Sequence, residues 1–257
     1  MRDVLSEIVA KKKITLAEQK TKKSLEEVKA AATVGSFKMT SAVKRGGWSL
    51  IAECKLQSPV KGRLQKSHSV TELAKIYAAA GATMLSVHTD EHFLGRNEDI
   101  VSVRELVDIP ILRKDFIIDE YQIYEARCLG ADAVLLIARI LTADELKKFL
   151  ATARNLGLNA LVEVHDEDDM EKISDADIEF LGINNRNLHT FETSVNNTLE
   201  LLPHAKKHDA VLISESGVFT AEDAAKLREV GCDGILVGEG LVRADDIATK
   251  VRELMLK

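Results

Sequence analysis

Eight short apolar runs recur along this chain, and each is followed by a longer stretch with the spacing of an amphipathic helix. The runs are Ser49–Glu53, Met84–Val87, Pro110–Leu112, Ala133–Ile137, Ala160–Val164, Phe180–Ile183, Val211–Ser214 and Gly234–Val237. Continuous runs of Val, Ile and Leu are typical of parallel strands that are covered on both faces. Eight strand–helix units within 257 residues predict an α/β protein, a single (β/α)8 TIM barrel.

The stretches between these runs carry the start and stop signals of helices. Ser69 with Glu72, and Thr142 with Glu145, have the three-residue spacing of a capping box. Further N-cap candidates, and glycines at positions where helices should end, are Asp166, Thr220, Gly81, Gly130, Gly157 and Gly231. The order of strand, helix, glycine and strand therefore repeats along the chain.

The first 45 residues precede the first predicted strand, and Leu5, Ile8 and Val9 recur there at helical spacing. Because no Pro- or Gly-rich linker follows them, we expect one domain over residues 1–257, with residues 1–45 as an N-terminal helical extension. The alternative fold is an open doubly wound sheet. That fold usually carries a glycine-rich phosphate loop after its first strand, where this chain has Glu53–Lys55.

Composition and charge limit the classes of partner. The net charge of −6 disfavours nucleic acid as the main partner, although the N-terminal arm is locally basic. No apolar stretch approaches the ~20 residues of a membrane span, and the start lacks a signal-peptide core. The three cysteines have no motif spacing, which favours reduced thiols and a cytoplasmic protein. We expect a monomer that acts on a small molecule, with neither nucleic acid nor a membrane as a partner.

Polar side chains fall at the predicted carboxyl ends of five strands. In a barrel of this type the chemistry belongs to that rim, because aliphatic layers fill the interior. The candidates, each in phase with inward-facing residues of its strand, are Glu53 and Lys55, Lys114, Glu163, Asn184 followed by Arg186, and Glu215. Mixed carboxylates and cations give proton donors and acceptors different pKa values. We therefore predict an active site at this rim. His88, at the end of the second strand, we expect to be packed or hydrogen-bonded.

Two glycine-containing segments, Glu215–Gly217 and Gly238–Gly240, follow the last two strands. Loops at these positions commonly bind phosphate in such barrels, because glycine lets backbone N–H groups approach the anion. The sequence thus predicts a small phosphorylated substrate. The acidic segment His165–Asp169 could hold a metal, but acidic residues also favour the first turn of a helix, and we prefer that interpretation.

Five motifs resemble the indole-3-glycerol phosphate synthase family, in order and spacing, from about Leu5 to the C-terminus. They are Ile51–Lys55 with Ser58-Pro59 and Lys61-Gly62, Leu112–Phe116, Leu161–Val164, Gly182–Leu188 and Ser214–Gly217. The resemblance implies a decarboxylating, dehydrating ring closure in tryptophan biosynthesis. The implied substrate is 1-(2-carboxyphenylamino)-1-deoxyribulose 5-phosphate, and no metal or organic cofactor is implied.

The resemblance also implies a role for each site residue. Lys114 would be the general acid on the ribulose carbonyl oxygen, and Glu163 the general base as the hydroxyl leaves. Lys55 would hold the substrate carboxylate and act as a second acid, oriented by Glu53. The implied binding residues are Asn184, Arg186 and Glu215 for the substrate's hydroxyls and charges, Phe93 for its aromatic ring, and Ser58, Ser216, Gly217, Gly238 and the Glu239 amide for the phosphate.

On physical grounds we expect burial of Lys114 near a second cation, Lys55, to lower its pKa toward the working pH, where a general acid is most effective. Several positions depart from the family pattern. Val60 stands where the family usually has serine, Gly240 where serine or alanine is commoner, and the segment Thr89–Phe93 is one residue short. Two alternatives remain open. One is another phosphate-binding barrel, such as phosphoribosylanthranilate isomerase. The other is a barrel that binds phosphorylated ligands or a partner protein without turnover.

Overall fold

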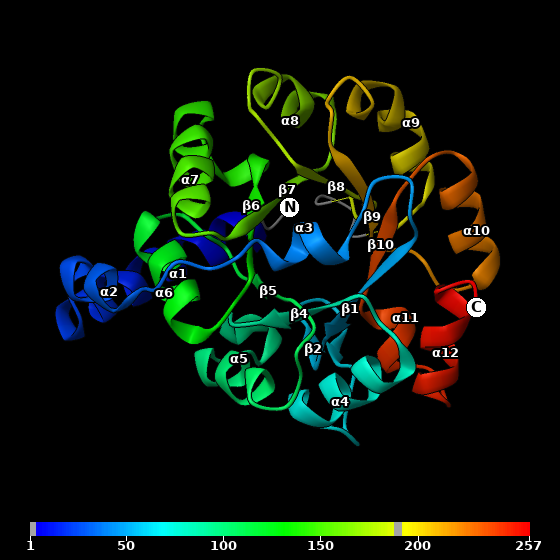
Figure 1. The fold of residues 1–257 in the computed structure, drawn as a ribbon, viewed down its shortest axis with the longest axis horizontal. Helices are drawn as coiled ribbons and strands as arrows, with labels where there is room; N and C mark the ends of the chain where they lie inside the picture. Colours follow the sequence, from blue (N-terminus) through cyan, green and yellow to red (C-terminus); the bar gives the residue numbers. More distant parts are fainter. Residues whose placement is uncertain (1–3, 188–191) are drawn as a thin grey trace.

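The computed structural model describes residues 4–187 and 192–257. Within these residues, eight parallel strands close a barrel in the order β1-β10-β9-β8-β7-β6-β5-β4 (Figure 1). The strands are β1 (Ser49–Cys54), β4 (Met84–His88), β5 (Ile111–Lys114), β6 (Ala133–Ile137), β7 (Asn159–Val164), β8 (Phe180–Asn184), β9 (Val211–Glu215) and β10 (Gly234–Val237). The predicted (β/α)8 barrel is confirmed, and the open sheet is excluded because β1 pairs with both β10 and β4.

Several strands extend beyond the apolar runs that predicted them. The largest difference is at β5, which begins after Pro110 and continues to Lys114. Proline has no N–H to donate to the ladder, so the strand begins one residue later than predicted. At the other end the ladder continues into polar residues, where His88 pairs with Lys114 and Asn184 with Glu215. Backbone pairing does not depend on apolar side chains, so the apolar pattern ends before the strands do.

Helices surround the barrel (Figure 1). They are α4 (Val70–Ala80), α5 (Asn97–Arg104), α6 (Glu120–Leu129), α7 (Ala143–Asn155), α8 (Glu167–Lys172), α9 (Asn196–Ala205), α10 (Ala221–Glu229), α11 (Glu239–Val242) and α12 (Ile247–Leu254). The capping boxes predicted at Ser69 and Thr142 are both present. Gly81 ends α4 with a φ of 94°, a left-handed conformation that glycine adopts without strain.

Aliphatic side chains fill the barrel interior. Met84, Leu112, Leu161 and Ile213 are buried there, each from a different strand. A larger apolar cluster lies between the strands and the surrounding helices. Because the interior is packed, an open space for a substrate can form only where the strands end.

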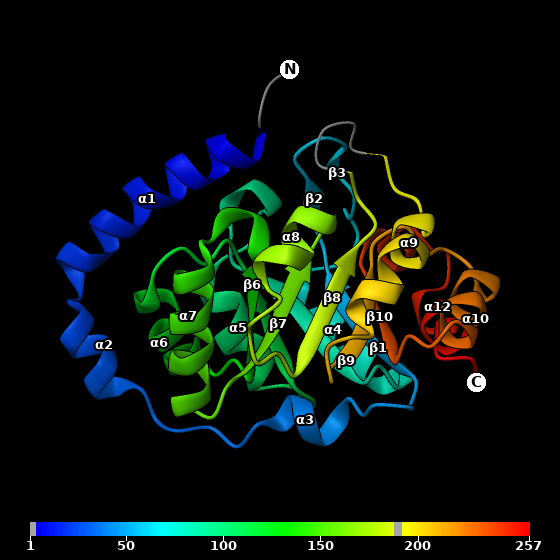
Figure 2. The same ribbon diagram turned by 90° about the horizontal axis from the view of Figure 1, so that it is seen from above.

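The N-terminal arm runs along one side of the barrel from one end to the other (Figure 2). Its helices are α1 (Val4–Lys22), α2 (Leu25–Ala31) and α3 (Lys38–Ala42). α3 covers the amino-terminal ends of the strands and contributes Met39 to the interior cluster, together with Val43, the residue that follows the helix. α1 lies toward the carboxyl ends of the strands. None of the helices in the described ranges combines the length and apolar character needed to cross a bilayer.

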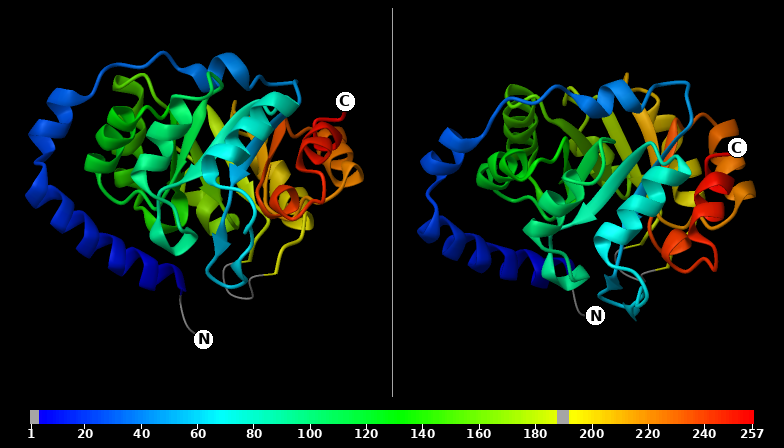
Figure 3. Two further views of the ribbon diagram at one scale, coloured as in Figure 1. Left: turned by 90° about the horizontal axis from the view of Figure 1, so that it is seen from below. Right: turned by 60° about the horizontal axis from the view of Figure 1, so that its bottom comes forward.

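Two short elements stand at the carboxyl end of the barrel. The antiparallel hairpin of β2 (Gln57–Ser58) and β3 (Gly62–Arg63) follows β1 and projects toward the same end as the N-terminus (Figure 3). The single-turn helix η1 (Glu91–Phe93) follows β4. The Gln57 side chain donates to the His92 carbonyl oxygen at 3.1 Å, so the hairpin and η1 are joined.

Candidate active site

One pocket at the carboxyl ends of the strands is lined by every residue that the sequence analysis proposed for the site. These residues are Glu53, Lys55, Ser58, Phe93, Lys114, Glu163, Asn184, Arg186, Glu215, Ser216, Gly217, Gly238 and Glu239. The barrel brings them together because parallel strands present all their carboxyl ends at one rim. Their common location is observed, whereas their chemical roles stay predictions.

Lys114 is the last residue of β5, and its ammonium group lies between two buried carboxylates. Its Nζ donates to Oε2 of Glu163 at 2.9 Å and to Oε2 of Glu215 at 2.8 Å. Burial lowers the pKa of Lys114, but attraction to Glu163, Glu215 and Glu53 outweighs it, so the pKa is raised. The expectation of a lowered pKa is therefore wrong for this site. The acidic side chains of β7, β9 and β1 decide the direction of the shift, and Lys55 does not.

Glu163 and Glu215 share Lys114 but have different surroundings. Burial raises the pKa of Glu163, but Lys114 and His165, whose Nε2 is 3.2 Å from Oε1, hold it well below its usual range. Burial and the negative charge of Glu163 raise the pKa of Glu215 to about 8, against the attraction of Lys114. At neutral pH the site therefore holds Glu163 as a carboxylate and Glu215 as a carboxylic acid.

One oxygen of Glu215 is left without a partner. Its Oε1 is buried and makes no hydrogen bond to any residue that the structure describes. Gly182 provides the room for this oxygen, since a Cβ at that position would overlap it. Because an unpaired buried polar atom is costly, this oxygen is a natural contact for a polar group of a substrate.

Glu53, on β1, lies at the centre of a second charged cluster. Its Oε2 is 3.4 Å from Nζ of Lys55, and its Oε1 is 2.8 Å from Nε2 of His88. Burial raises the pKa of Glu53, but Lys55 and His88 outweigh it, so Glu53 is ionised. A Cβ at Gly238 would overlap the Glu53 carboxylate, which explains why glycine is needed where β10 ends beside β1.

Phe93 stands beside this cluster on η1. Its ring stacks on the His88 imidazole with a centroid distance of 4.3 Å and an interplanar angle of 6°. The ring of Phe116 is 6.3 Å away, and Nζ of Lys55 lies 5.3 Å from the Phe93 centroid. The pocket therefore has an aromatic wall next to a cation.

The predicted phosphate-binding residues lie on the β2–β3 hairpin and on the loops after β9 and β10. Ser216 and Gly217 both have positive φ, 66° and 74°, so the chain turns sharply as it leaves β9. The Ser216 N–H is already engaged, since it donates to the Leu236 carbonyl oxygen at 3.2 Å. The Glu239 carboxylate already has partners. It accepts from Nζ of Lys61 at 2.8 Å and from Nη1 of Arg243, the residue after α11, at 3.0 Å.

Asn184 and Arg186 complete the polar lining. Oδ1 of Asn184 accepts from the backbone N–H of Arg186 at 3.0 Å, which joins the end of β8 to the loop that follows. Arg186 also pairs with Thr193 in an isolated bridge. Leu188, the last residue of its motif, lies outside the described residues.

Sequence reasoning missed part of the lining. His165 lies two residues after Glu163, the same spacing that identified Lys55 after Glu53, so this signal could have found it. Apolar side chains of α1 also line the pocket, among them Leu5 and Ile8. Their helical spacing was recognised, but spacing does not tell which surface an apolar helix face covers.

The acidic segment after β7 has a structural role. The Asp166 side chain caps α8 by accepting from the backbone N–H of Asp169 at 3.1 Å, as an acidic first turn predicts. Asp169 in turn lies 3.3 Å from Nδ1 of His165. Among the described residues, no group of three or more His, Cys, Asp or Glu side chains has the arrangement of a metal site.

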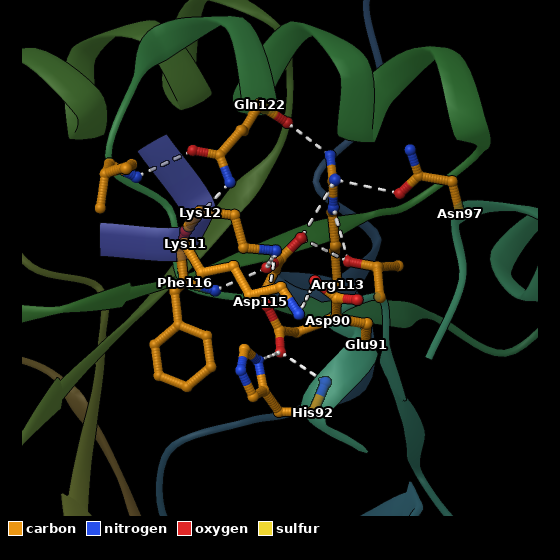
Figure 4. Close-up of polar contacts among 12 residues, drawn as sticks. Lys11, Lys12, Asp90, Glu91, His92, Asn97, Arg113, Asp115, Phe116 and Gln122 are labelled. Atoms are coloured by element: carbon orange, nitrogen blue, oxygen red, sulfur yellow. Dashed lines mark hydrogen bonds and ion pairs between the residues drawn. The ribbon is translucent and has the colours of Figure 1, made fainter. Parts of the chain in front are cut away.

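A buried ion-pair network connects α1 to the pocket (Figure 4). Nζ of Lys12 is 2.7 Å from Oδ2 of Asp90 and 2.7 Å from Oδ1 of Asp115. Asp115 directly follows Lys114 and also pairs with Arg113 at 3.2 Å. Asp90 caps η1, the element that carries Phe93. One lysine therefore joins the N-terminal helix to two elements of the site.

Known proteins resemble this chain over almost its whole length. The profile of the family described as indole-3-glycerol phosphate synthase matches residues 5–254. A relative with that name from Acetivibrio thermocellus is 42% identical over 97% of this chain and 98% of its own. Another from Neisseria gonorrhoeae is also 42% identical, over 99% of this chain and 100% of its own.

Solved structures of lower sequence identity share the barrel. A 3-hexulose-6-phosphate synthase superposes with a TM-score of 0.65 at 16% identity, over 81% of this chain and 98% of its own. A thiamine phosphate pyrophosphorylase from Pyrococcus furiosus has a TM-score of 0.58 at 16% identity, over 81% of this chain and 93% of its own. At such identities the likeness supports the fold and nothing more specific.

Proposed function

The chain belongs to the indole-3-glycerol phosphate synthase family and is a carboxy-lyase of tryptophan biosynthesis, and we propose that its rim pocket carries out the whole reaction with the residues described above. The substrate is 1-(2-carboxyphenylamino)-1-deoxyribulose 5-phosphate. Ring closure, loss of carbon dioxide and loss of water give indole-3-glycerol phosphate. The proton transfers of this reaction need one group that donates a proton to oxygen and one that removes a proton from carbon or nitrogen.

Lys114 is the acid in the first step. Its raised pKa keeps the ammonium protonated in the resting site, so a proton is available for the substrate's carbonyl oxygen. Protonation of that oxygen makes the carbonyl carbon electrophilic, and the aromatic ring attacks it. The carboxyl group then leaves as carbon dioxide. A positioned acid of this kind contributes on the order of 10²–10⁴ to the rate.

Glu163 is the base in the later step, and proton donation by Lys114 prepares it. While Lys114 is charged, its attraction holds the pKa of Glu163 well below the usual range. When Lys114 has given up its proton, that attraction is gone and Glu163 becomes a stronger base. Glu163 then takes a proton as the hydroxyl group leaves. The order of the two steps follows from this coupling.

Lys55 and Phe93 hold the anthranilate part of the substrate. The ammonium of Lys55 pairs with the substrate carboxylate, is held by Glu53 and acts as a second acid on the departing hydroxyl. Phe93 packs on the aromatic ring. Asn184, Arg186 and the unpaired oxygen of Glu215 contact the hydroxyl groups.

The phosphate binds between the hairpin and the last two loops. We assign it to Ser58, Ser216, Gly217, Gly238 and the backbone of Glu239. Backbone N–H groups suit an anion because they need no charged side chain to be held in place. Binding energy from the phosphate helps to hold the reacting carbon against the ring.

The observation that carries this proposal is the contact of one ammonium, Lys114, with both Glu163 and Glu215 in the pocket. The test is turnover by purified Lys114→Ala, followed by the fluorescence of the indole product. We expect the variant to stay folded by circular dichroism and to lose at least ~100-fold in kcat. The exposed Lys148→Ala is the matched control and should keep wild-type turnover. Near-wild-type turnover by Lys114→Ala would remove Lys114 from the mechanism.

We also propose that the protein acts as a cytoplasmic monomer, with neither nucleic acid nor a membrane as a partner. All the assigned groups come from a single chain, so the site needs no second copy. The net charge of −6 supports the absence of a nucleic-acid partner. Light scattering of the purified protein during gel filtration measures the mass, and a mass of two chains would contradict the monomer.

A further inference from the structure

His88 has no assigned role in the site, yet it touches two groups that do. It is the last residue of β4, pairs in register with Lys114 and lines the pocket. It is 5% exposed, with Nε2 2.8 Å from Oε1 of Glu53. The imidazole also stacks on the ring of Phe93, with a centroid distance of 4.3 Å.

These contacts form a closed circuit of four side chains. His88 contacts Glu53, Glu53 lies 3.4 Å from the ammonium of Lys55, and Lys55 lies 5.3 Å from the centroid of Phe93. Phe93 returns to His88 through the stacked rings. Glu53 comes from β1, His88 from β4 and Phe93 from η1. The imidazole of His88 contacts both Glu53 and Phe93 and so joins β1 to η1.

We propose that His88 is a positioning residue of the reaction, which fixes the Glu53 carboxylate through its Nε2–H and the Phe93 ring through stacking. This proposal rests on the proposed function, in which Lys55 holds the substrate carboxylate and Phe93 its aromatic ring. The imidazole thereby sets the position of the two groups that receive the anthranilate part of the substrate. It does not itself exchange a proton with the substrate.

The two oxygens of Glu53 show why a donor is needed at position 88. Oε2 faces Lys55, and Oε1 would be a buried acceptor without a partner if the imidazole were absent. A carboxylate that loses one contact is free to rotate about its last torsion. Lys55 would then lose the fixed partner that holds its ammonium against the aromatic wall.

The charge of the imidazole fits this role. Burial lowers the pKa of His88 against the opposing pull of Glu53, so the ring is neutral at neutral pH. The charged groups that face it are Glu53, Lys55 and Lys114. A neutral donor satisfies Oε1 without adding a third cation, so the negative charge of Glu53 remains available to Lys55.

Three substitutions separate the two contacts. His88→Leu removes both the donor and the ring, His88→Gln keeps a donor near the Nε2 position, and His88→Phe keeps a stacking ring. We expect His88→Leu to lower kcat/KM about 10- to 100-fold, the scale of a displaced catalytic group. His88→Gln should recover kcat with a raised KM, whereas His88→Phe should recover KM with a low kcat. The control His204→Leu, on α9, should match the wild type.

A purely structural role predicts a different result. His88 would then affect the melting temperature alone, and all three variants would keep wild-type kcat and KM while folded. That outcome overturns the proposal. So does a result in which His88→Gln and His88→Phe lose the same parameter by the same factor, because the two contacts would then not be separable.

A measurement without turnover keeps this test independent of the proposed function. The ¹⁵N shifts of the His88 ring, assigned by comparison with His88→Gln, should show the Nε2–H tautomer in the wild type. They should move in Glu53→Gln, which removes the anionic acceptor. An Nδ1–H tautomer overturns the proposal. If the wild type makes no indole product, the proposed function fails, and the ring spectrum still decides whether His88 holds Glu53.

Discussion

Glu163 and Glu215 both contact the ammonium of Lys114, yet their other neighbours give them opposite charge states. Glu163 has a second positive neighbour in His165, whereas Glu215 faces the negative charge of Glu163. Lys114 therefore contacts one carboxylate and one carboxylic acid within the same pocket, and their other neighbours make the difference. At the residue scale, the pH dependence of the enzyme follows from these contacts.

The alkaline limb of activity is expected to belong to Glu215. Its pKa is raised to about 8, so its proton is present below that pH and is lost as the pH rises through it. Loss of the proton places a second anion beside Glu163 and disfavours the working site. We predict that kcat/KM falls above about pH 8 in the wild type. In Glu215→Gln, which stays neutral, this limb should disappear from the pH profile; a limb that persists assigns it to another group.

His165 makes a second pH-dependent contribution, this time to stability. Burial lowers its pKa, but hydrogen bonds and attraction from Asp169 and Glu163 raise it from 6.5 to about 9. A raised pKa means that the folded state binds the proton more tightly than the unfolded chain. The stabilisation is therefore complete below pH 6.5 and is lost as the pH rises through 9. Its size is on the order of 3 kcal/mol.

We predict that His165→Gln loses more stability at pH 6 than at pH 9.5. Urea denaturation of both proteins at both pH values measures the two differences in free energy of unfolding. The lost packing and hydrogen bonds contribute at either pH, so only the charge produces a pH-dependent difference. Equal losses at the two pH values would show that His165 is neutral in the folded protein.

At the scale of elements, the attachment of α1 to the barrel depends on the buried network in Figure 4. Lys12 is 12% exposed and lies between Asp90 and Asp115, while its neighbour Lys11 pairs with Glu91 at 53% exposure. The two adjacent lysines thus offer one buried and one exposed ion pair on the same helix. The buried lysine serves two carboxylates, of which Asp115 also pairs with Arg113 at 3.2 Å and Asp90 also contacts Nδ1 of His92 at 2.7 Å.

We expect Lys12→Met to destabilise the protein by roughly 3–5 kcal/mol, because two buried carboxylates each lose an ammonium partner and keep only their weaker share of other contacts. The change should also raise KM, since α1 lines the pocket. Thermal melting and steady-state kinetics measure the two effects. Lys11→Met is the control, and its exposed pair should contribute about 0–1 kcal/mol. Equal effects of the two substitutions would contradict the assigned difference in burial.

At the scale of the whole molecule, the two ends of the barrel differ. The rim carries the charged pocket, and α3 closes the opposite end (Figure 2). Asn159, the first residue of β7, fastens that closure. Its Oδ1 accepts from the backbone N–H groups of Met39 and Thr40 at 3.1 and 3.4 Å, and its amide donates to Glu179 at 2.9 Å. We propose that the arm and the barrel form one domain that unfolds together.

Asn159→Ala tests this separation. We expect a loss of roughly 2–3 kcal/mol, because buried backbone donors of α3 lose their acceptor. Unfolding should remain a single transition, and kcat at 25 °C should stay within about 2-fold of wild type, since the site is at the other end. Calorimetry and kinetics provide the two measurements. Two separate transitions would show that the arm is an independent unit.

Much of the site could be predicted from the sequence because strand ends obey a simple rule. Glu53, Lys114, Glu163 and Glu215 each follow an apolar run in the inward phase, and closure of the barrel brings them into one pocket. No such rule predicts which side chains of a loop or of the N-terminal arm face the pocket. The packing of Leu5 into the pocket is an example, because helical spacing carries no information about the partner surface.

The sequence by itself determined the barrel, the rim and the identities of the polar groups. The repeat of strands and helices can be recognised from residues that are close together in the sequence. Only the tertiary structure decided the charge states. Lys114 has a raised pKa because three acidic side chains from other strands act on it, and His88 faces Glu53 because β1 and β4 are neighbours in the barrel. A pKa depends on distances and burial, which exist only once distant segments of the chain meet.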